Sequence, residues 1–129
     1  MSAPSVISVV DDDASVRASM NNLFSSLGYV VHTFESAEQY LRSPHLSDTS
    51  CVITDVQMPG MDGVELLATM RMQGYATPFI VITAFPDESV RARAMKAGAI
   101  GFFAKPFAMP NLIACLDAAL ASQAGNVGA

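Results

Sequence analysis

The segment Cys51-Val-Ile-Thr-Asp-Val-Gln-Met-Pro-Gly-Met-Asp-Gly63 decides how the rest of this chain is interpreted. Apolar and β-branched residues lead into Asp55, the pair Pro59-Gly60 favours a turn, and Asp62-Gly63 begins a new segment. The pattern predicts a short buried strand, an acid at its carboxyl end, a loop and the start of a helix. Ligands bind at the carboxyl ends of the strands in an open α/β sheet, so Asp55 is a candidate nucleophile, metal ligand or general base. The alternative is that Asp55 only caps a structural element.

The same alternation of strand and helix repeats along the chain. Short apolar segments predict four more strands, at residues 5–10, 29–34, 78–83 and 100–104. Apolar residues at helical spacing predict helices at residues 13–27, 36–41, 62–74 and 86–98. A last helix is predicted after the turn at residues 105–107, with Leu112, Ile113, Leu116 and Leu120 as its apolar residues. Continuous apolar strands joined by helices indicate a parallel sheet with helices on both faces. We therefore predict an α/β fold with a doubly wound, five-stranded parallel sheet of strand order 2-1-3-4-5.

The predicted fourth helix, residues 86–98, differs from the others in its composition. It offers alanines in place of large apolar residues, at positions 92, 94 and 97. Few large apolar side chains mean little buried area, so we expect this helix to be loosely held and able to move.

The predicted strand order brings several polar residues to one edge of the sheet. Strands one and three are neighbours, so Asp11 and Asp12 after the first strand converge with Asp55 after the third. Three carboxylates so close would repel one another, and a hard divalent cation such as Mg²⁺ resolves that conflict. Thr83 and Lys105 end the fourth and fifth strands and reach the same rim. Acids, a metal, a hydroxyl and an ammonium together match phosphoryl transfer to a carboxylate.

Composition and charge limit the classes of function. The 129 residues suffice for one domain with a hydrophobic core. A net charge of −5 argues against nucleic acid binding by this chain. No apolar segment approaches the roughly 20 residues of a membrane span, and no signal peptide pattern is present, so we expect a cytoplasmic protein without membrane contact. We expect Cys51 and Cys115 to be core thiols rather than a disulfide.

Four motifs carry a resemblance to a known family. They are Val10-Asp11-Asp12-Asp13, Thr54-Asp55-Val56-Gln57-Met58-Pro59-Gly60-Met61-Asp62-Gly63, Val81-Ile82-Thr83-Ala84 and Phe102-Phe103-Ala104-Lys105-Pro106-Phe107. From Ser5 to Leu120 the chain resembles the receiver domains of two-component response regulators, and Met95-Lys96-Ala97-Gly98-Ala99 is similar to the FixJ-like branch. The resemblance implies the flavodoxin-like receiver fold, and we place this domain at residues 1–121. Residues 122–129 are small and polar, so we expect a short flexible tail there.

The resemblance also implies how the acids act. Asp55 would accept a phosphoryl group from a histidine kinase or a phosphotransfer protein. Asp11, Asp12, Asp55 and the backbone carbonyl of Gln57 would hold Mg²⁺. The chain would not be an enzyme in the ordinary sense, because it would catalyse only its own phosphorylation and a slow self-dephosphorylation.

For the other rim residues the resemblance implies a switch. Thr83 and Lys105 would bind the phosphoryl oxygens, and a cis bond between Lys105 and Pro106 would direct the lysine into the site. Phe102, where the family more often has Tyr, would turn inward when Thr83 moves. The surface of the fourth helix and fifth strand would then change, and would contact an output partner or a second copy of the chain.

Two other classes of function remain open on the sequence. One is a phosphohydrolase of the haloacid dehalogenase type, which needs an acid two residues after its nucleophile. Gln57 stands there and cannot transfer a proton usefully. The other is a receiver-like interaction module that acts without phosphorylation, although burying such a set of acids without a metal or phosphate costs stability.

The lifetime of the phosphorylated state is a further expectation. Gln57 and Phe85, two residues after Asp55 and Thr83, would flank the path of water to the phosphoryl group. An apolar ring orients water poorly, so we expect slow self-dephosphorylation if Phe85 covers the site.

The sequence does not name the kinase or the output of the switch. No helix-turn-helix pattern follows Leu120. We expect a stand-alone receiver, with a piece of a longer regulator as the alternative.

Overall fold

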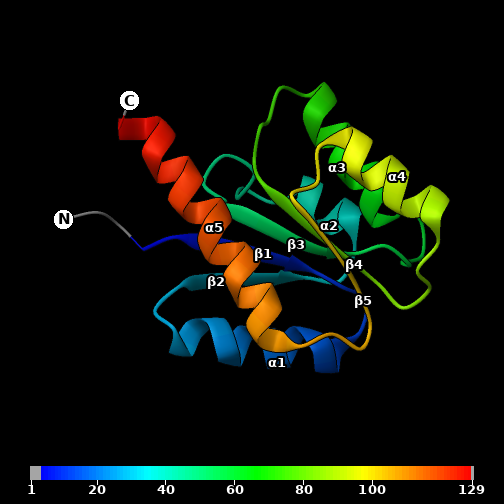
Figure 1. Ribbon diagram of the computed structural model, residues 1–129, viewed down its shortest axis with the longest axis horizontal. Helices are drawn as coiled ribbons and strands as arrows, with labels where there is room; N and C mark the ends of the chain where they lie inside the picture. Colours follow the sequence, from blue (N-terminus) through cyan, green and yellow to red (C-terminus); the bar gives the residue numbers. More distant parts are fainter. Residues whose placement is uncertain (1–3, 129) are drawn as a thin grey trace.

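The computed structural model describes residues 4–128 and contains one parallel sheet (Figure 1). The sheet has the order β2-β1-β3-β4-β5, which confirms the predicted fold. Its strands are β1 (Val6–Val10), β2 (Val30–Phe34), β3 (Cys51–Asp55), β4 (Phe79–Thr83) and β5 (Gly101–Ala104). Strands β3 and β4 are buried and apolar except for Thr54, Asp55 and Thr83 at their carboxyl ends. Both faces of these strands are covered by helices, which explains their apolar character.

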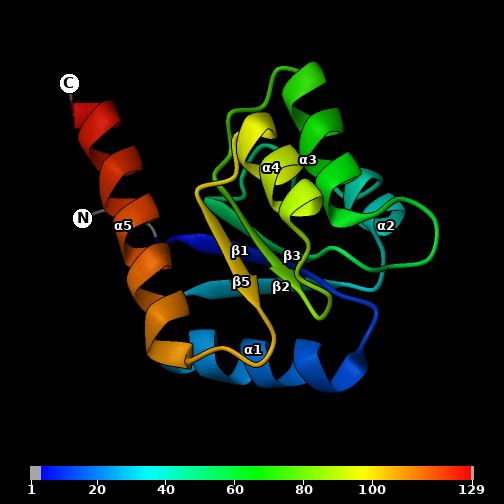
Figure 2. The same ribbon diagram turned by 45° about the vertical axis from the view of Figure 1, so that its right-hand side comes forward.

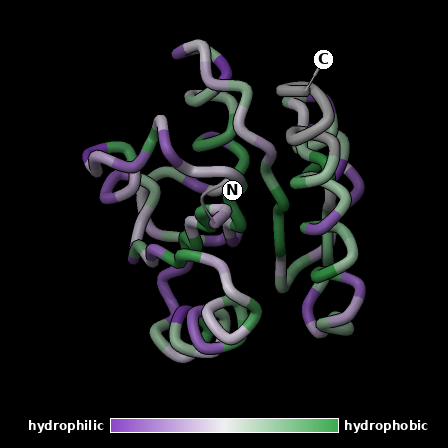
Figure 3. The backbone as a smooth tube through the Cα atoms, turned by 90° about the vertical axis from the view of Figure 1, so that its left-hand side faces the viewer, coloured by the Kyte–Doolittle hydropathy of each residue, from purple (hydrophilic) through white to green (hydrophobic). Residues whose placement is uncertain are grey.

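Helices cover both faces of the sheet (Figure 1, Figure 2). They are α1 (Ala14–Ser26), α2 (Ala37–Leu41), α3 (Gly63–Met72), α4 (Glu88–Ala97) and α5 (Met109–Gly128). One hydrophobic cluster joins the sheet to α1 and α5, and the other joins it to α2, α3 and α4. In Figure 3 the hydrophobic stretches lie toward the middle of the molecule and the hydrophilic stretches mostly at its periphery.

Aspartates begin three of the helices. The side chain of Asp13 accepts a hydrogen bond from the backbone of Ser15 at the start of α1, and Asp87 caps α4 in the same way. Asp62 and Glu65 form a reciprocal capping box at the start of α3. The predicted starts of α1 and α3 are therefore confirmed, and α4 begins shortly after Pro86, as the sequence indicated.

Strand register sets the positions of the polar residues. Val10 pairs with Thr54, Asp55 with Ile82, and Thr83 with Ala104. Asp11 and Lys105 directly follow the ends of β1 and β5. The acids, the hydroxyl and the lysine therefore meet at the carboxyl edge of the sheet.

The expected flexible tail at residues 122–129 stays a prediction. Helix α5 continues as far as Gly128. The segment lacks the apolar spacing that was used to end the helix at Leu120, but its alanines and Gln123 are good helix formers, and a helical backbone satisfies its own hydrogen bonds. The domain boundary at residue 121 stays a prediction. Within residues 4–128, no helix has both the length and the apolar character that crossing a bilayer requires.

Candidate functional site

Three aspartates form a compact cluster at the carboxyl ends of β1 and β3. Each of Asp11, Asp12 and Asp55 places one carboxylate oxygen within 4.8 Å of those of the other two. Asp11 and Asp55 are buried, whereas Asp12 is exposed. Asp55 Oδ1 is buried and has no hydrogen-bond partner among the described residues. An unpaired buried oxygen inside a cluster of acids is costly unless a cation or a proton binds to it.

Burial and mutual repulsion change how the acids titrate. Burial raises the pKa of Asp55 to about 6, and the neighbouring Asp11 adds to the shift. Burial also raises the pKa of Asp11, although the backbone N–H of Asp13, which donates to Asp11 Oδ1 over 2.9 Å, and the ammonium of Lys105 oppose the shift. Without a cation the site therefore holds its negative charge at a free-energy cost.

Lys105 lies directly over the two buried acids. Its Nζ is 3.6 Å from Asp11 Oδ2 and 3.7 Å from Asp55 Oδ2. The Lys105-Pro106 bond is cis, as the resemblance implied. One ammonium facing two carboxylates leaves a net negative charge, so the cluster still favours a cation.

The loop after Asp55 is fixed from two sides. A Cβ atom at position 63 would collide with the backbone carbonyl oxygen of Asp55, so only glycine lets α3 start this close to β3. Glu38 in α2 accepts a hydrogen bond of 2.9 Å from the backbone N–H of Met61. Both contacts hold the phosphoacceptor candidate and its loop in place.

Thr83 is fully buried, and its hydroxyl binds the side chain of Gln57. Thr83 Oγ1 donates to Gln57 Oε1 over 2.9 Å and accepts from the backbone N–H of Phe85 over 3.0 Å. The backbone N–H of Ala84 also donates to Gln57 Oε1, over 3.3 Å. Sequence reasoning placed Gln57 beside the path of water and gave its backbone carbonyl to Mg²⁺, but it did not find this hydrogen bond to Thr83. The metal-ligand role stays a prediction.

Phe102 and Phe85 lie in different surroundings. Phe102 pairs with Val81 in the sheet and packs, half-buried, against the cluster on the side of α3 and α4. Thr83 lies two positions after Val81 and shares its face, so Phe102 and Thr83 lie on the same side of the sheet. The ring of Phe85 is 71% exposed, so most of it faces solvent. The structure therefore gives no support to the idea of Phe85 as a lid over Asp55.

Sequence reasoning also missed the contact made by Arg17 in α1. Its Nη1 donates to the backbone carbonyl of Asp11 over 2.6 Å, and its other amino group is 3.7 Å from Glu35. The contact of Arg17 with Asp11 joins residues six positions apart, and that of Glu38 with Met61 joins residues 23 positions apart. No local sequence pattern predicts contacts at these spacings.

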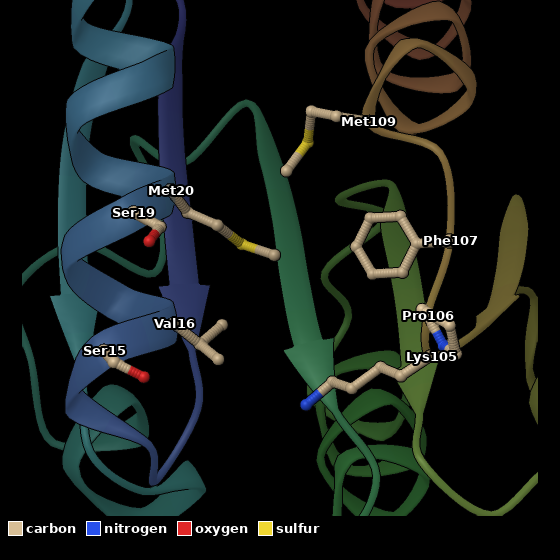
Figure 4. Close-up of a pocket in the computed structure, with 8 residues that line it drawn as sticks. All are labelled: Ser15, Val16, Ser19, Met20, Lys105, Pro106, Phe107 and Met109. Atoms are coloured by element: carbon tan, nitrogen blue, oxygen red, sulfur yellow. The ribbon is translucent and has the colours of Figure 1, made fainter.

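A cavity of about 330 Å³ lies beside Lys105, between α1 and the segment that follows β5 (Figure 4). Val16 and Met20 reach it from α1, and Phe107 and Met109 reach it from the opposite side. Lys105 extends across one end of the cavity, near the carboxyl end of β3. An apolar hollow therefore adjoins the acidic cluster.

The donor set fits Mg²⁺. This ion takes hard oxygen ligands, binds through a few carboxylates and keeps several waters and substrate oxygens. The clustered carboxylates, including the unpaired Asp55 Oδ1, supply such oxygens at the carboxyl ends of β1 and β3.

Comparison with known proteins identifies the family. The response regulator receiver domain family matches residues 7–117, so the chain belongs to this family of two-component signalling domains. Receiver domains of this family are phosphorylation-activated switches, and they bind Mg²⁺ at an acidic pocket of the kind found here.

Individual relatives agree with this assignment. The transcriptional regulatory protein FixJ of Bradyrhizobium diazoefficiens is 42% identical over 88% of this chain and 56% of its own length. The transcriptional regulatory protein TdiR of Thauera aromatica is 38% identical over 91% of this chain and 52% of its own. The chain thus spans about half the length of these curated relatives.

Solved structures show the same fold. The response regulator StyR superposes with a TM-score of 0.89 at 37% identity, over 98% of this chain and 64% of that one. The crystal structure of FixJ-N superposes with a TM-score of 0.81 at 34% identity, over 92% of this chain and 95% of that one.

Proposed function

We propose that Asp55 accepts a phosphoryl group in a Mg²⁺-dependent reaction and that this switches the surface formed by α4 and β5. The observation that carries the proposal is the buried, unpaired Asp55 Oδ1 inside the three-acid cluster that faces Lys105. A carboxylate oxygen that has no hydrogen-bond partner and belongs to a group close to an ammonium is available as a nucleophile toward phosphorus.

In the proposed reaction an Asp55 oxygen forms a bond to phosphorus while the bond from phosphorus to the donor's imidazole nitrogen breaks, and that nitrogen keeps the electron pair. Asp11, Asp12, Asp55 and the backbone carbonyl of Gln57 are the proposed holders of Mg²⁺, which would neutralise the phosphoryl oxygens when bound. Lys105 and Thr83 are the proposed contacts to the remaining oxygens. The chain's own contribution is position and charge.

The proposed phosphodonor is a sensor histidine kinase or a phosphotransfer protein. The cavity between α1 and the segment after β5 gives such a protein an apolar anchoring point next to Lys105. Histidine kinases are phosphorylated with ATP as the donor, so we place the reaction in the cytoplasm. The output partner, or a second copy of this chain, is proposed to contact α4 and β5. Slow self-dephosphorylation remains part of the proposal, without the contribution of Phe85 as a lid.

The test uses acetyl phosphate as a small phosphodonor, with mass spectrometry of the intact protein. We expect the mass gain of one phosphoryl group in wild type with Mg²⁺, and none in Asp55→Asn or after EDTA treatment. Asp48→Asn, which removes an exposed acid in the loop before β3, is the matched control and should be labelled like wild type. Equal labelling of Asp55→Asn, or labelling that persists in EDTA, would contradict the assignment.

A further inference from the structure

The single hydrogen of the Thr83 hydroxyl is already donated in this structure. Gln57 Oε1 accepts from Thr83 Oγ1 over 2.9 Å and from the backbone N–H of Ala84 over 3.3 Å. A backbone N–H can only donate, so the Gln57 atom that faces Ala84 is the amide oxygen and not the nitrogen. Since an amide oxygen only accepts, Thr83 must be the donor in its bond to Gln57.

A hydroxyl has one hydrogen to donate. That hydrogen points at Gln57, and the backbone N–H of Phe85 donates to the same hydroxyl from another direction. Thr83 can donate to a phosphoryl oxygen on Asp55 only after its hydrogen leaves Gln57. Gln57 and the phosphoryl group therefore compete for one hydrogen bond.

We propose that the side chain of Gln57 is a latch that holds Thr83 and the start of the segment before α4 in the unphosphorylated arrangement. This inference rests on the proposed function, because it takes Thr83 as the hydroxyl that turns to the phosphoryl group. Gln57 is a positioning residue here, since its side chain acts through Thr83. Its place two residues after Asp55 ties the latch to the loop that carries the phosphoacceptor.

The bond to Ala84 extends the latch toward α4. Residues 84–87 connect β4 to α4, and all four are exposed. Of the described residues of α4, Ala94 alone is fully buried, so packing contributes little to fixing the N-terminal end of the helix. The two hydrogen bonds to Gln57 therefore restrain a segment that has few other contacts to hold it.

The direction of the effect follows from linkage. A bond made only in the unphosphorylated arrangement opposes the switch, so removing the acceptor shifts the population toward the arrangement that binds a phosphoryl group. A typical net hydrogen-bond contribution corresponds to roughly a fivefold change in affinity. Beryllofluoride, whose beryllium and fluorine atoms stand in for phosphorus and its oxygens, should thus bind Gln57→Leu roughly fivefold more tightly than wild type at saturating Mg²⁺.

The test is a double-mutant cycle of Gln57→Leu and Thr83→Val. In the Thr83→Val background the hydroxyl is absent, so Gln57→Leu should change beryllofluoride affinity much less than it does in wild type. In the absence of Mg²⁺ and beryllofluoride, the amide signals of Ala84 and Phe85 in Gln57→Leu should move toward the positions they take in activated wild type. Gln57→Glu is the matched control, because it keeps an acceptor at the same reach and should leave both amide signals near their wild-type positions.

Two outcomes would overturn the latch: an equal change in affinity in both Thr83 backgrounds, or unmoved Ala84 and Phe85 signals in Gln57→Leu. If Gln57→Leu does not fold, Gln57→Asn replaces it, since a side chain one methylene shorter cannot span the same distance. The amide signals are read without any phosphoryl group, so they report on the latch even if Asp55 fails to be labelled by acetyl phosphate.

Discussion

Helices α3 and α4 lie on the same face of the sheet and have ten residues each, yet they are attached to it very differently. Both begin with an aspartate cap. Helix α3 buries five residues, namely Gly63, Val64, Leu66, Leu67 and Met70. In α4 only Ala94 is fully buried among the described residues, while Val90 and Ala97 are half-buried.

The difference assigns separate tasks to the two helices. Helix α3 follows the loop after Asp55, where Gly63 contacts the backbone of β3, so the phosphoacceptor candidate stands on a fixed element. Helix α4 follows the Thr83 segment and can shift at little cost in buried apolar area. A switch needs one fixed and one movable element. If α3 and α4 moved together with the site, phosphorylation would not change the position of α4 relative to the rest of the domain.

The comparison predicts unequal losses of stability when each helix is trimmed. Leu66→Ala in α3 removes a fully buried side chain and should lower the free energy of unfolding by about 3 kcal/mol. Val90→Ala in α4 is the matched change and should cost about 1 kcal/mol or less. Urea denaturation of both variants measures the two values, and equal losses would break the contrast between the helices.

The close approach of Gly63 to the Asp55 carbonyl oxygen predicts the next largest loss of stability. Gly63→Ala places a methyl group against the Asp55 carbonyl oxygen and should cost about 2 kcal/mol, with reduced labelling of Asp55 by acetyl phosphate. Gly74→Ala is the control, because position 74 has open space but a φ of +91°. We expect about 1 kcal/mol there and normal labelling. Normal labelling of Gly63→Ala would mean that α3 does not fix the site.

The acids beside α3 should make stability depend on pH when no metal is present. The pKa of Asp55 is raised to about 6 in the folded protein from an ordinary value of 3.8, so the folded state binds the proton more tightly than the unfolded state. Stability in EDTA should therefore rise by about 1 kcal/mol as the pH falls from 7 through 6 to 5. The buried Asp11, whose pKa is also raised, acts in the same direction.

Asp55→Asn should remove most of this rise in thermal melts. An identical pH dependence of the melting temperature in wild type and Asp55→Asn over this interval would show that the acids are not crowded as the structure has them.

The smallest expected effect is a pattern of chemical shifts. Beryllofluoride with Mg²⁺ should move amide signals from Thr83 through Phe103, because this stretch contains the proposed switch hydroxyl, α4 and Phe102. Signals of α3 beyond its first turn should move less. Heteronuclear NMR of the amide groups measures both, and equal shifts along α3 would remove the distinction between a fixed and a movable helix.

Residues that lie at the carboxyl ends of strands could be placed from the sequence alone. Asp11, Asp12, Asp55 and Lys105 could be brought together because a parallel sheet places the carboxyl ends of its strands on one edge, and apolar patterning located those ends. The weak attachment of α4 was also predictable, since alanines cannot bury much area wherever they point.

Contacts that depend on side-chain direction could not be predicted. Nothing in the sequence indicates that the amide of Gln57 faces Thr83, or that Arg17 donates to the backbone of Asp11. Phe85 was open to two interpretations because a ring beside a site either covers it or faces solvent, and only the fold decides. Such contacts join residues whose spacing follows no local period.

The small buried area of α4 also affects how easily its exposed surface can change in sequence. Three of the seven lysines and arginines of the chain, Arg91, Arg93 and Lys96, lie on this one helix and are exposed, in a chain of net charge −5. Because these side chains are not part of the core, they can be exchanged for acids or apolar groups with little loss of folding stability. The same phosphorylation chemistry could then be retargeted to a new partner by rewriting a single helix, while the acid cluster and its supporting helix stay as they are.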